Sequence, residues 1–297
     1  MEKSGRFVLM LNYFSSNWCS LNWVPWIRIK TKREERKIIP NSQGVYRVRP
    51  RGKDFLVYVG QTNQLKRRTG MLALNSYKEE MPWNDPHTAA PNLWVWRQEQ
   101  GWDYEVSVAA TPAITRQKRQ GLECLLLWRY RLERGESTLC NHGRFHPDYV
   151  KSSNRLKGIR GRKLDSNETR NPAGGPSSPP LRPLNTHMSS DWMGLSWTEF
   201  EKLKTASLLP ADPGVYKLVD LANHALLYVG ETDNLRSRLN QHKRKFLDTV
   251  FSYVTLSSEM LHYERLEIEN DLIGYQYYIT GKSPSCQFGK ERSYSRS

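Results

Sequence analysis

The chain repeats itself at a fixed spacing. The tripeptide Gly44–Tyr46 (Gly-Val-Tyr) recurs as Gly214–Tyr216, and Tyr58–Gly60 (Tyr-Val-Gly) recurs as Tyr228–Gly230, each 170 residues later. Three more pairs keep the same spacing: Thr62 and Thr232, Leu65 and Leu235, and Arg68 and Arg238. Two tripeptides that recur in register with three further residues are not a chance match. The sequence therefore contains two copies of one folding unit.

The pattern around each tripeptide predicts a hairpin, a basic helix, a third strand and a long apolar-striped helix. Polar turn residues separate the two hairpin strands, at 51–54 in the first copy and at 220–224 in the second. We expect first-copy strands at 45–48, 56–59 and 104–109 and helices at 65–74 and 116–134. The second copy is expected to have strands at 215–219, 226–229 and 251–256 and helices at 235–246 and 259–279.

Composition predicts the domain boundaries. The segment 151–187 is basic and then rich in Pro, Gly and Ser, a composition that cannot bury a core and is typical of a linker. We expect a Trp-rich basic arm (1–41) packed on the first domain (42–150), then the linker (151–187), the second domain (188–289) and a tail (290–297).

The excess of positive over negative charge is confined to the first part of the chain, residues 1–165. The net charge is +15, and residues 1–165 hold 30 Lys and Arg against 15 Asp and Glu, whereas residues 166–297 hold 15 of each. A surface of this kind suits a polyanion, because each phosphate contact releases condensed counterions. The alternative is a charged face that only keeps the protein in solution.

Hydropathy argues against a membrane protein, and the cysteine pattern argues against a disulfide-bonded one. Mean hydropathy is −0.71 and no apolar run approaches the roughly 20 residues of a spanning helix, so we expect no membrane partner. The four cysteines form no CxxC pair, which favours a reduced, cytoplasmic protein. Cys140, His142 and His146 are three potential metal ligands within seven residues, but no fourth ligand is evident.

The two tripeptides, and the arginine ten residues after the second tyrosine, resemble those of the GIY-YIG nuclease superfamily. That superfamily includes homing endonucleases, some restriction enzymes and the incision subunit of bacterial nucleotide excision repair. The resemblance covers roughly residues 42–145 and 212–288. It implies an α/β fold class with two small domains, each a three-stranded antiparallel sheet flanked by helices, and hydrolysis of phosphodiester bonds with one divalent metal ion.

The resemblance also implies the site residues. Tyrosine, arginine and histidine positions map onto Tyr46, Tyr58 and Arg68 in the first copy and onto Tyr216, Tyr228, Arg238 and His242 in the second. The first tyrosine of each copy is expected to act as general base and the second to orient water or phosphate, with His242 sharing proton transfer. The first copy departs from the pattern, because Leu72 occupies the position of His242. An asparagine that many members have after a proline has no counterpart in Pro284–Gln287, and Asn141 follows Glu123 by a long spacing.

A glutamate on the long helix completes the set. Glu123 and Glu269 each lie on the apolar stripe of that helix, where a carboxylate is costly unless it has a partner such as a metal ion. We therefore expect both to bind Mg²⁺ (or Mn²⁺). Glu267 has polar neighbours in sequence, and we interpret it as solvated.

Basic residues beside these positions are the expected contacts to double-stranded DNA. They are Lys66, Arg67, Arg160, Arg162, Lys163, Arg236, Lys243, Arg244 and Lys245. The first copy also carries 24 extra residues between its arginine and its glutamate. This insertion includes Pro82-Trp83, Pro86-His87 and Trp94–Trp96, which either stack on bases or form a local core, the latter being slightly favoured.

The sequence thus predicts a metal-dependent DNA endonuclease, of a restriction or defence type or of a repair type, with two catalytic half-sites in one chain. We expect both copies to cut, since each has the tyrosines, the arginine and the glutamate. One alternative is a DNA-binding protein in which one or both copies are inactive, and the charge asymmetry favours a division in which the basic first copy grips DNA and the second copy, which has His242, cuts it. Another alternative is a structural or partner-binding protein. Oligomeric state stays open.

Overall fold

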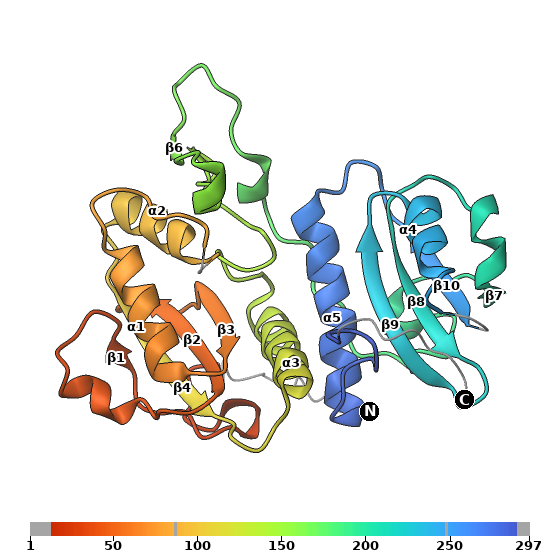
Figure 1. The fold of residues 1–297 in the computed structure, drawn as a ribbon, viewed down its shortest axis with the longest axis horizontal. Helices are drawn as coiled ribbons and strands as arrows, with labels where there is room; N and C mark the ends of the chain where they lie inside the picture. The colour runs from red at the N-terminus through yellow and green to blue at the C-terminus, as the bar shows by residue number, and fades with distance from the viewer. Residues whose placement is uncertain (1–12, 86–87, 247–248, 290–297) are drawn as a thin grey trace, which may run out of the picture.

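The computed structural model describes residues 13–85, 88–246 and 249–289 (Figure 1). The tail (290–297), the first twelve residues of the arm and Pro86-His87 lie outside the described residues. The first copy consists of β1 (Ile27–Arg28), β2 (Gly44–Pro50), β3 (Tyr58–Thr62), α1 (Leu65–Ser76), α2 (Ala90–Gln100), β4 (Tyr104–Ala110) and α3 (Arg116–Arg134). The second consists of β7 (Glu201–Lys202), β8 (Gly214–Asp220), β9 (Ala225–Thr232), α4 (Leu235–His242), β10 (Val250–Thr255) and α5 (His262–Thr280).

Short elements complete the chain. A two-stranded sheet of β5 (Tyr149–Val150) and β6 (Arg162–Lys163) lies in the segment between the two copies. The 3₁₀ helices are η1 (Trp18–Ser20), η2 (Glu35–Ile38), η3 (Arg155–Lys157), η4 (Pro172–Gly174), η5 (Trp192–Gly194) and η6 (Leu203–Leu208).

Each copy is built on an antiparallel sheet, which confirms the α/β class. The strand orders are β1-β4-β2-β3 and β7-β10-β8-β9. The three expected strands form the body of each sheet, and a two-residue strand, β1 or β7, adds a fourth at one edge. The helix expected at 235–246 ends earlier, at His242. Figure 1 shows the two sheets on opposite sides of the helices α3 and α5.

The glycines of the repeated tripeptides permit close packing. A Cβ on Gly60 would lie 2.7 Å from the hydroxyl oxygen of Tyr46, and one on Gly230 would lie 2.5 Å from that of Tyr216. Tyr46 pairs with Gly60 and Tyr216 with Gly230 across the hairpin, so each glycine makes room for the tyrosine ring opposite it. The conserved spacing of the two tripeptides within each copy is thus a packing requirement as well as a resemblance.

The repeat begins earlier than the tripeptides indicate. Trp18, Trp23 and Trp26 surround the guanidinium of Arg47, at 5.7, 4.2 and 4.8 Å from their ring centroids. In the second copy Trp192, Trp197 and Phe200 surround the ammonium of Lys217 in the same way, at 5.6, 4.3 and 5.1 Å. Both cations are on the first hairpin strand and almost fully buried. Each aromatic cage fastens the segment before the sheet by cation–π contacts, so the Trp-rich segment is not particular to the first copy.

The insertion in the first copy forms a local core, which was the favoured alternative. It folds into α2, whose Leu93 joins the core of the first sheet, and Trp96 stacks on Trp102 with ring centroids 5.4 Å apart. The ring of Trp83 packs under the guanidinium of Arg160. These aromatic side chains are therefore engaged within the protein.

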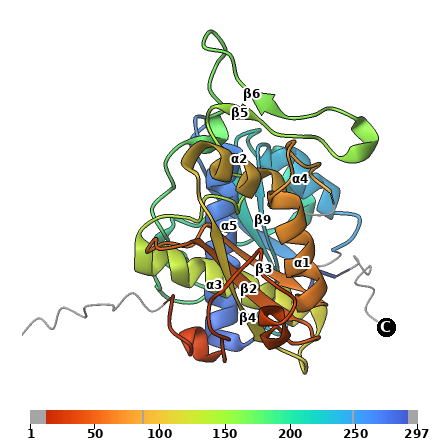
Figure 2. The same cartoon turned by 90° about the vertical axis from the view of Figure 1, so that its left-hand side faces the viewer.

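The two copies meet through α3 and α5, which pack directly against each other (Figures 1 and 2). Equivalent positions on these helices are 146 residues apart, as Glu123 and Glu269 are. The amide of Asn270 donates to the carbonyl of Cys124 at 3.3 Å, and these two residues are equivalent. Gly274 packs against Trp128, which is also its equivalent. Contacts between equivalent positions are the signature of an isologous pair, so the copies are related by an approximate two-fold axis.

A buried charge network fixes this interface. The guanidinium of Arg131 on α3 lies 2.9 Å from the carboxylate of Asp271 and 3.0 Å from that of Glu267, both on α5, and all three side chains are fully buried. Arg144 bonds the other oxygen of Glu267 at 3.1 Å. The interpretation of Glu267 as solvated is therefore wrong. Its polar sequence neighbours concealed the fact that this face of α5 meets cations from the first copy.

The Pro-rich segment between the copies is bound to the same network. The amide nitrogens of Ser178 and Leu181 donate to the carboxylates of Glu267 and Asp271, at 2.8 and 3.0 Å, and the indole of Trp128 donates to the carbonyl of Leu181. A segment without a core of its own is thus held by hydrogen bonds to charged groups, which are stronger than neutral ones.

Removing the buried Arg131 side chain should destabilise the folded protein. Arg131→Met leaves buried carboxylates without their main partner, so we expect the free energy of unfolding to fall by about 3–5 kcal/mol. Urea denaturation followed by tryptophan fluorescence measures this loss. Arg162→Met is the control, because the Arg162–Glu168 pair lies on the surface and should contribute little. Equal losses in the two variants would contradict the importance of the buried network.

Candidate active sites

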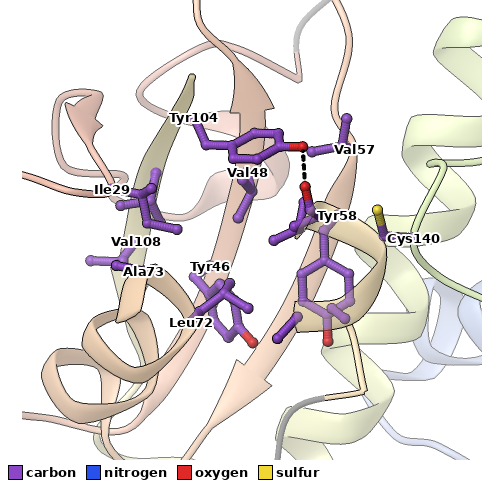
Figure 3. Close-up of a cluster of buried hydrophobic side chains, with 14 of the residues drawn as sticks. Ile29, Tyr46, Val48, Val57, Tyr58, Leu72, Ala73, Tyr104, Val108 and Cys140 are labelled. Atoms are coloured by element: carbon purple, nitrogen blue, oxygen red, sulfur yellow. Dashed lines mark hydrogen bonds between the residues drawn. The ribbon is translucent and has the colours of Figure 1, made fainter. Parts of the chain in front are cut away.

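The first copy brings its two tyrosines and its arginine together. Tyr46 on β2 and Tyr58 on β3 have ring centroids 5.8 Å apart, and Figure 3 shows both hydroxyls pointing to the same side. Arg68 lies in the first turns of α1, and its Nε donates to the Tyr46 hydroxyl at 3.3 Å. The helix runs unbroken past Gly70, where a Cβ would lie 3.3 Å from Arg36, which bonds Thr69 on the same helix. Gly70 therefore accommodates a contact and does not interrupt the helix.

The second copy repeats this geometry and adds a histidine. The rings of Tyr216 and Tyr228 are stacked with centroids 6.1 Å apart, and Arg238 Nε donates to the Tyr216 hydroxyl at 3.1 Å. His242 Nε2 lies 2.8 Å from the same hydroxyl. The hydroxyl oxygen of Tyr216 accepts from Arg238, and in the Nδ1–H tautomer of His242 the hydroxyl donates to the imidazole.

The difference between the copies lies at the histidine position. Leu72 replaces His242 and is fully buried in the core beside Tyr46 and Tyr58. Burial, with the nearby charges of Arg238 and Lys245, lowers the pKa of His242 to about 4, so the imidazole is neutral at pH 7. A neutral imidazole can accept a hydrogen bond from the Tyr216 hydroxyl, and the first copy has no such acceptor at this position.

Both glutamates face these tyrosines and arginines, in half-buried positions on α3 and α5. Burial raises the pKa of Glu123 to about 7, against the lowering effect of Arg68. Burial raises the pKa of Glu269 to about 8, and the neighbouring carboxylate of Glu231 adds to the rise. Each carboxyl group is therefore easily protonated on its own, and a cation beside it would favour its charged form.

A metal ion would have few protein ligands here. Among residues 13–85, 88–246 and 249–289, no three His, Cys, Asp or Glu side chains are grouped to hold one. Mg²⁺ differs from zinc, because it keeps several waters and is usually bound by one or two carboxylates together with substrate phosphates. The single buried carboxylate of each site, backed by Glu231 in the second, fits that mode of binding.

Comparison of the chain with models of known families, with curated proteins and with solved structures found no match. Within the described part of the chain, no helix is long and apolar enough to cross a membrane.

The Cys140, His142 and His146 cluster does not converge. Cys140 packs in the core of the first copy, and the ring of His146 contacts Trp96 and Tyr149 while its Nδ1 accepts from a backbone amide. Burial lowers the pKa of His142 to about 3. These residues pack as structural groups.

Two amide side chains, which sequence reasoning did not pair, cap the outer strand of each sheet. Asn141 bonds both the backbone N–H and the C=O of Val59, at 3.0 and 2.8 Å. Gln287 does the same to Val229, at 2.9 and 2.8 Å. Each follows its glutamate by eighteen residues, so Gln287 is the counterpart of Asn141. The shared 146-residue spacing was the signal that could have found this pair.

Some of the residues expected to contact DNA are exposed, whereas others are half-buried or already interact with side chains of the protein. Lys66, Arg67, Arg236 and Arg244 are exposed on or just after α1 and α4, whereas Lys243 and Lys245 are half-buried. Between the copies, Arg162 and Lys163 form ion pairs with Glu168 and Glu99, and Arg160 stacks on Trp83. Of the expected DNA contacts, those that are exposed and take no part in these interactions therefore lie on or just after the two helices that carry the site arginines.

The buried histidine should make stability depend on pH. The pKa of an unfolded histidine is about 6.5, so between pH 6.5 and 4 the unfolded chain binds a proton that folded His242 refuses. Stability is full above pH 6.5 and falls as the pH drops, by about 2 kcal/mol at pH 4.5 from this group alone. His242→Leu, which copies Leu72, should lose that part of the slope in urea unfolding at pH 4.5 and 7.5. An unchanged slope would exclude a neutral His242.

Proposed function

We propose that the chain is a metal-dependent DNA endonuclease of GIY-YIG type. The observation that carries the proposal is the convergence, in both copies, of two tyrosines, an arginine and a half-buried glutamate at one end of an antiparallel sheet. These side chains reach one place from a hairpin, a short helix and a long helix. Packing alone does not require a carboxylate in such a place, since an apolar residue would be less costly there.

The roles follow from the hydrogen bonds of the second copy. Arg238 donates to the hydroxyl oxygen of Tyr216 and would stabilise negative charge on that oxygen or on a phosphate beside it. His242 accepts the tyrosine proton, so Tyr216 can in turn accept one from an attacking water. Tyr228 lies against the rings of Tyr216 and His242, and its proposed role is to orient the water or the phosphate.

Glu269 would hold Mg²⁺ (or Mn²⁺) in the second copy, and Glu123 occupies the equivalent position in the first copy. When bound, the ion supplies Lewis-acid polarisation of the phosphate and stabilises the leaving oxygen. The half-buried carboxylate contributes the charge that holds the ion, and the tyrosines and arginine orient the groups around it.

Double-stranded DNA is the proposed substrate. The excess positive charge and the exposed basic residues Lys66, Arg67 and Arg236 suit a phosphate backbone. The approximate two-fold relation between α3 and α5 matches the two-fold relation between the strands of a duplex. The proposal includes a cytoplasmic location, where such DNA is accessible. Restriction or defence and DNA repair are the two biological roles that it allows.

Loss of the second glutamate should abolish cutting. Glu269→Gln keeps the shape of the side chain and removes its charge, so nicking of supercoiled plasmid with Mg²⁺ should fall at least about 100-fold. Duplex affinity should be nearly unchanged. The control is Glu259→Gln, an exposed residue just before α5, which should cut normally. Glu267→Gln is unsuitable as a control because Glu267 is buried in the interface.

DNA binding should depend steeply on salt. If several Lys and Arg contact phosphates, the logarithm of the binding constant should fall linearly with the logarithm of salt concentration, with a slope of about −0.9 per phosphate contact. Fluorescence anisotropy with a labelled duplex, in EDTA, measures the slope without cleavage. Affinity that is flat between 50 and 200 mM salt would argue against a phosphate-tracking surface.

A further inference from the structure

An open cleft of about 510 Å³ lies beside the first candidate site, and all of its charged lining residues are arginines. Arg68 comes from α1, and Arg116 and Arg119 come from the first turn of α3. The other lining residues are neutral and polar, namely Gln43, Gln61, Thr62 and Asn63. We name this hollow the arginine cleft.

Neutral partners hold one of these arginines in place. Arg119 donates from Nε to the Gln61 side chain at 2.8 Å and from Nη1 to the Gln43 side chain. The amides orient the guanidinium and leave its charge uncompensated. Burial lowers the pKa of Arg119, and the like charge of Arg116 lowers it further.

The second copy provides an internal comparison, because the same positions carry different charges. Glu231 stands where the first copy has Gln61, and His262 stands where it has Arg116. The carboxylate of Glu231 accepts from Arg265, the counterpart of Arg119, at 3.0 Å and lies 3.3 Å from His262 Nε2. Arg265 is thus paired with a carboxylate within the protein, whereas its counterpart Arg119 is bonded to two neutral amide side chains.

We infer that the arginine cleft is an oxyanion site that holds a backbone phosphate of DNA, and that the first copy grips while the second copy cuts. Guanidinium groups whose orientation is fixed by side-chain amides bind phosphate oxygens in pairs, and a polar, open cleft admits a chain passing through it. The absence of a histidine beside Tyr46 and the presence of one beside Tyr216 divide the two roles in the same way. The choice of DNA as the source of the phosphate rests on the proposed function, but the oxyanion site itself does not.

The two copies supply matched variants for the test. Gln61→Glu gives the first copy the carboxylate of the second, and Arg116→His replaces an exposed arginine by its counterpart. With inorganic phosphate as probe, isothermal titration of the full chain should show one site, weakened at least tenfold by either variant. Glu231→Gln performs the opposite exchange and should add a second, weaker phosphate site. Phosphate binding that neither Gln61→Glu nor Arg116→His alters would overturn the inference.

A second measurement separates this inference from the proposed function. In EDTA, Arg116→His should weaken duplex binding several-fold. In Mg²⁺, Glu123→Gln should leave double-strand cutting unchanged if the first copy only grips, and conversion of double-strand breaks to nicks would refute that division of roles. A chain that binds phosphate as described but cuts no DNA with Mg²⁺ or Mn²⁺ would refute the proposed nuclease and leave the oxyanion site standing.

Discussion

The pairing of Arg131 with Glu267 and Asp271 is the interaction on which the arrangement of this molecule depends. It joins the helix that carries Glu123 to the helix that carries Glu269, and it binds the segment between the copies as well. Three fully buried ionic side chains are stable only because each finds several partners in good geometry. Any rotation of one copy against the other would break these ion pairs and leave unpaired charges in the protein interior, which solvates them poorly. The network therefore sets the relative orientation of the two candidate sites more strictly than apolar packing would.

The two copies share their packing features and differ at their candidate sites. The glycine–tyrosine packing, the caged cations and the amide caps of the outer strands occur in both copies with the same partners. Apart from the insertion that forms α2, the differences described above lie at the sites, where Leu72 corresponds to His242 and Gln61 corresponds to Glu231. The repeated scaffold thus lets one chain combine two electrostatic environments.

The elements of the fold followed from the sequence where local patterns were strong. The helix expected at 116–134 has those bounds, and every expected strand overlaps an observed one, although the strand expected at 56–59 begins at Tyr58 and runs to Thr62. The site set could also be predicted, because the fixed spacing named Tyr46, Arg68 and their counterparts together. What local patterns cannot reveal is which polar face meets another element. Glu267 has polar neighbours along the chain, yet its partners Arg131 and Arg144 are more than 120 residues away. The aromatic cages were missed for a related reason, since their spacing to the tripeptides differs by four residues between copies.

The contacts along the approximate axis join equivalent positions of the two copies. Where Cys124 meets Asn270 and Trp128 meets Gly274, each residue touches the counterpart of its own position. Two separate, identical chains associating about a two-fold axis make contacts of this kind, and an arbitrary docking of two domains does not. The interface within this one chain therefore has the contact pattern of a homodimer. Because the two halves differ in sequence, glycine at 274 can lie opposite tryptophan at 128, a pairing that two identical chains could not form at this position.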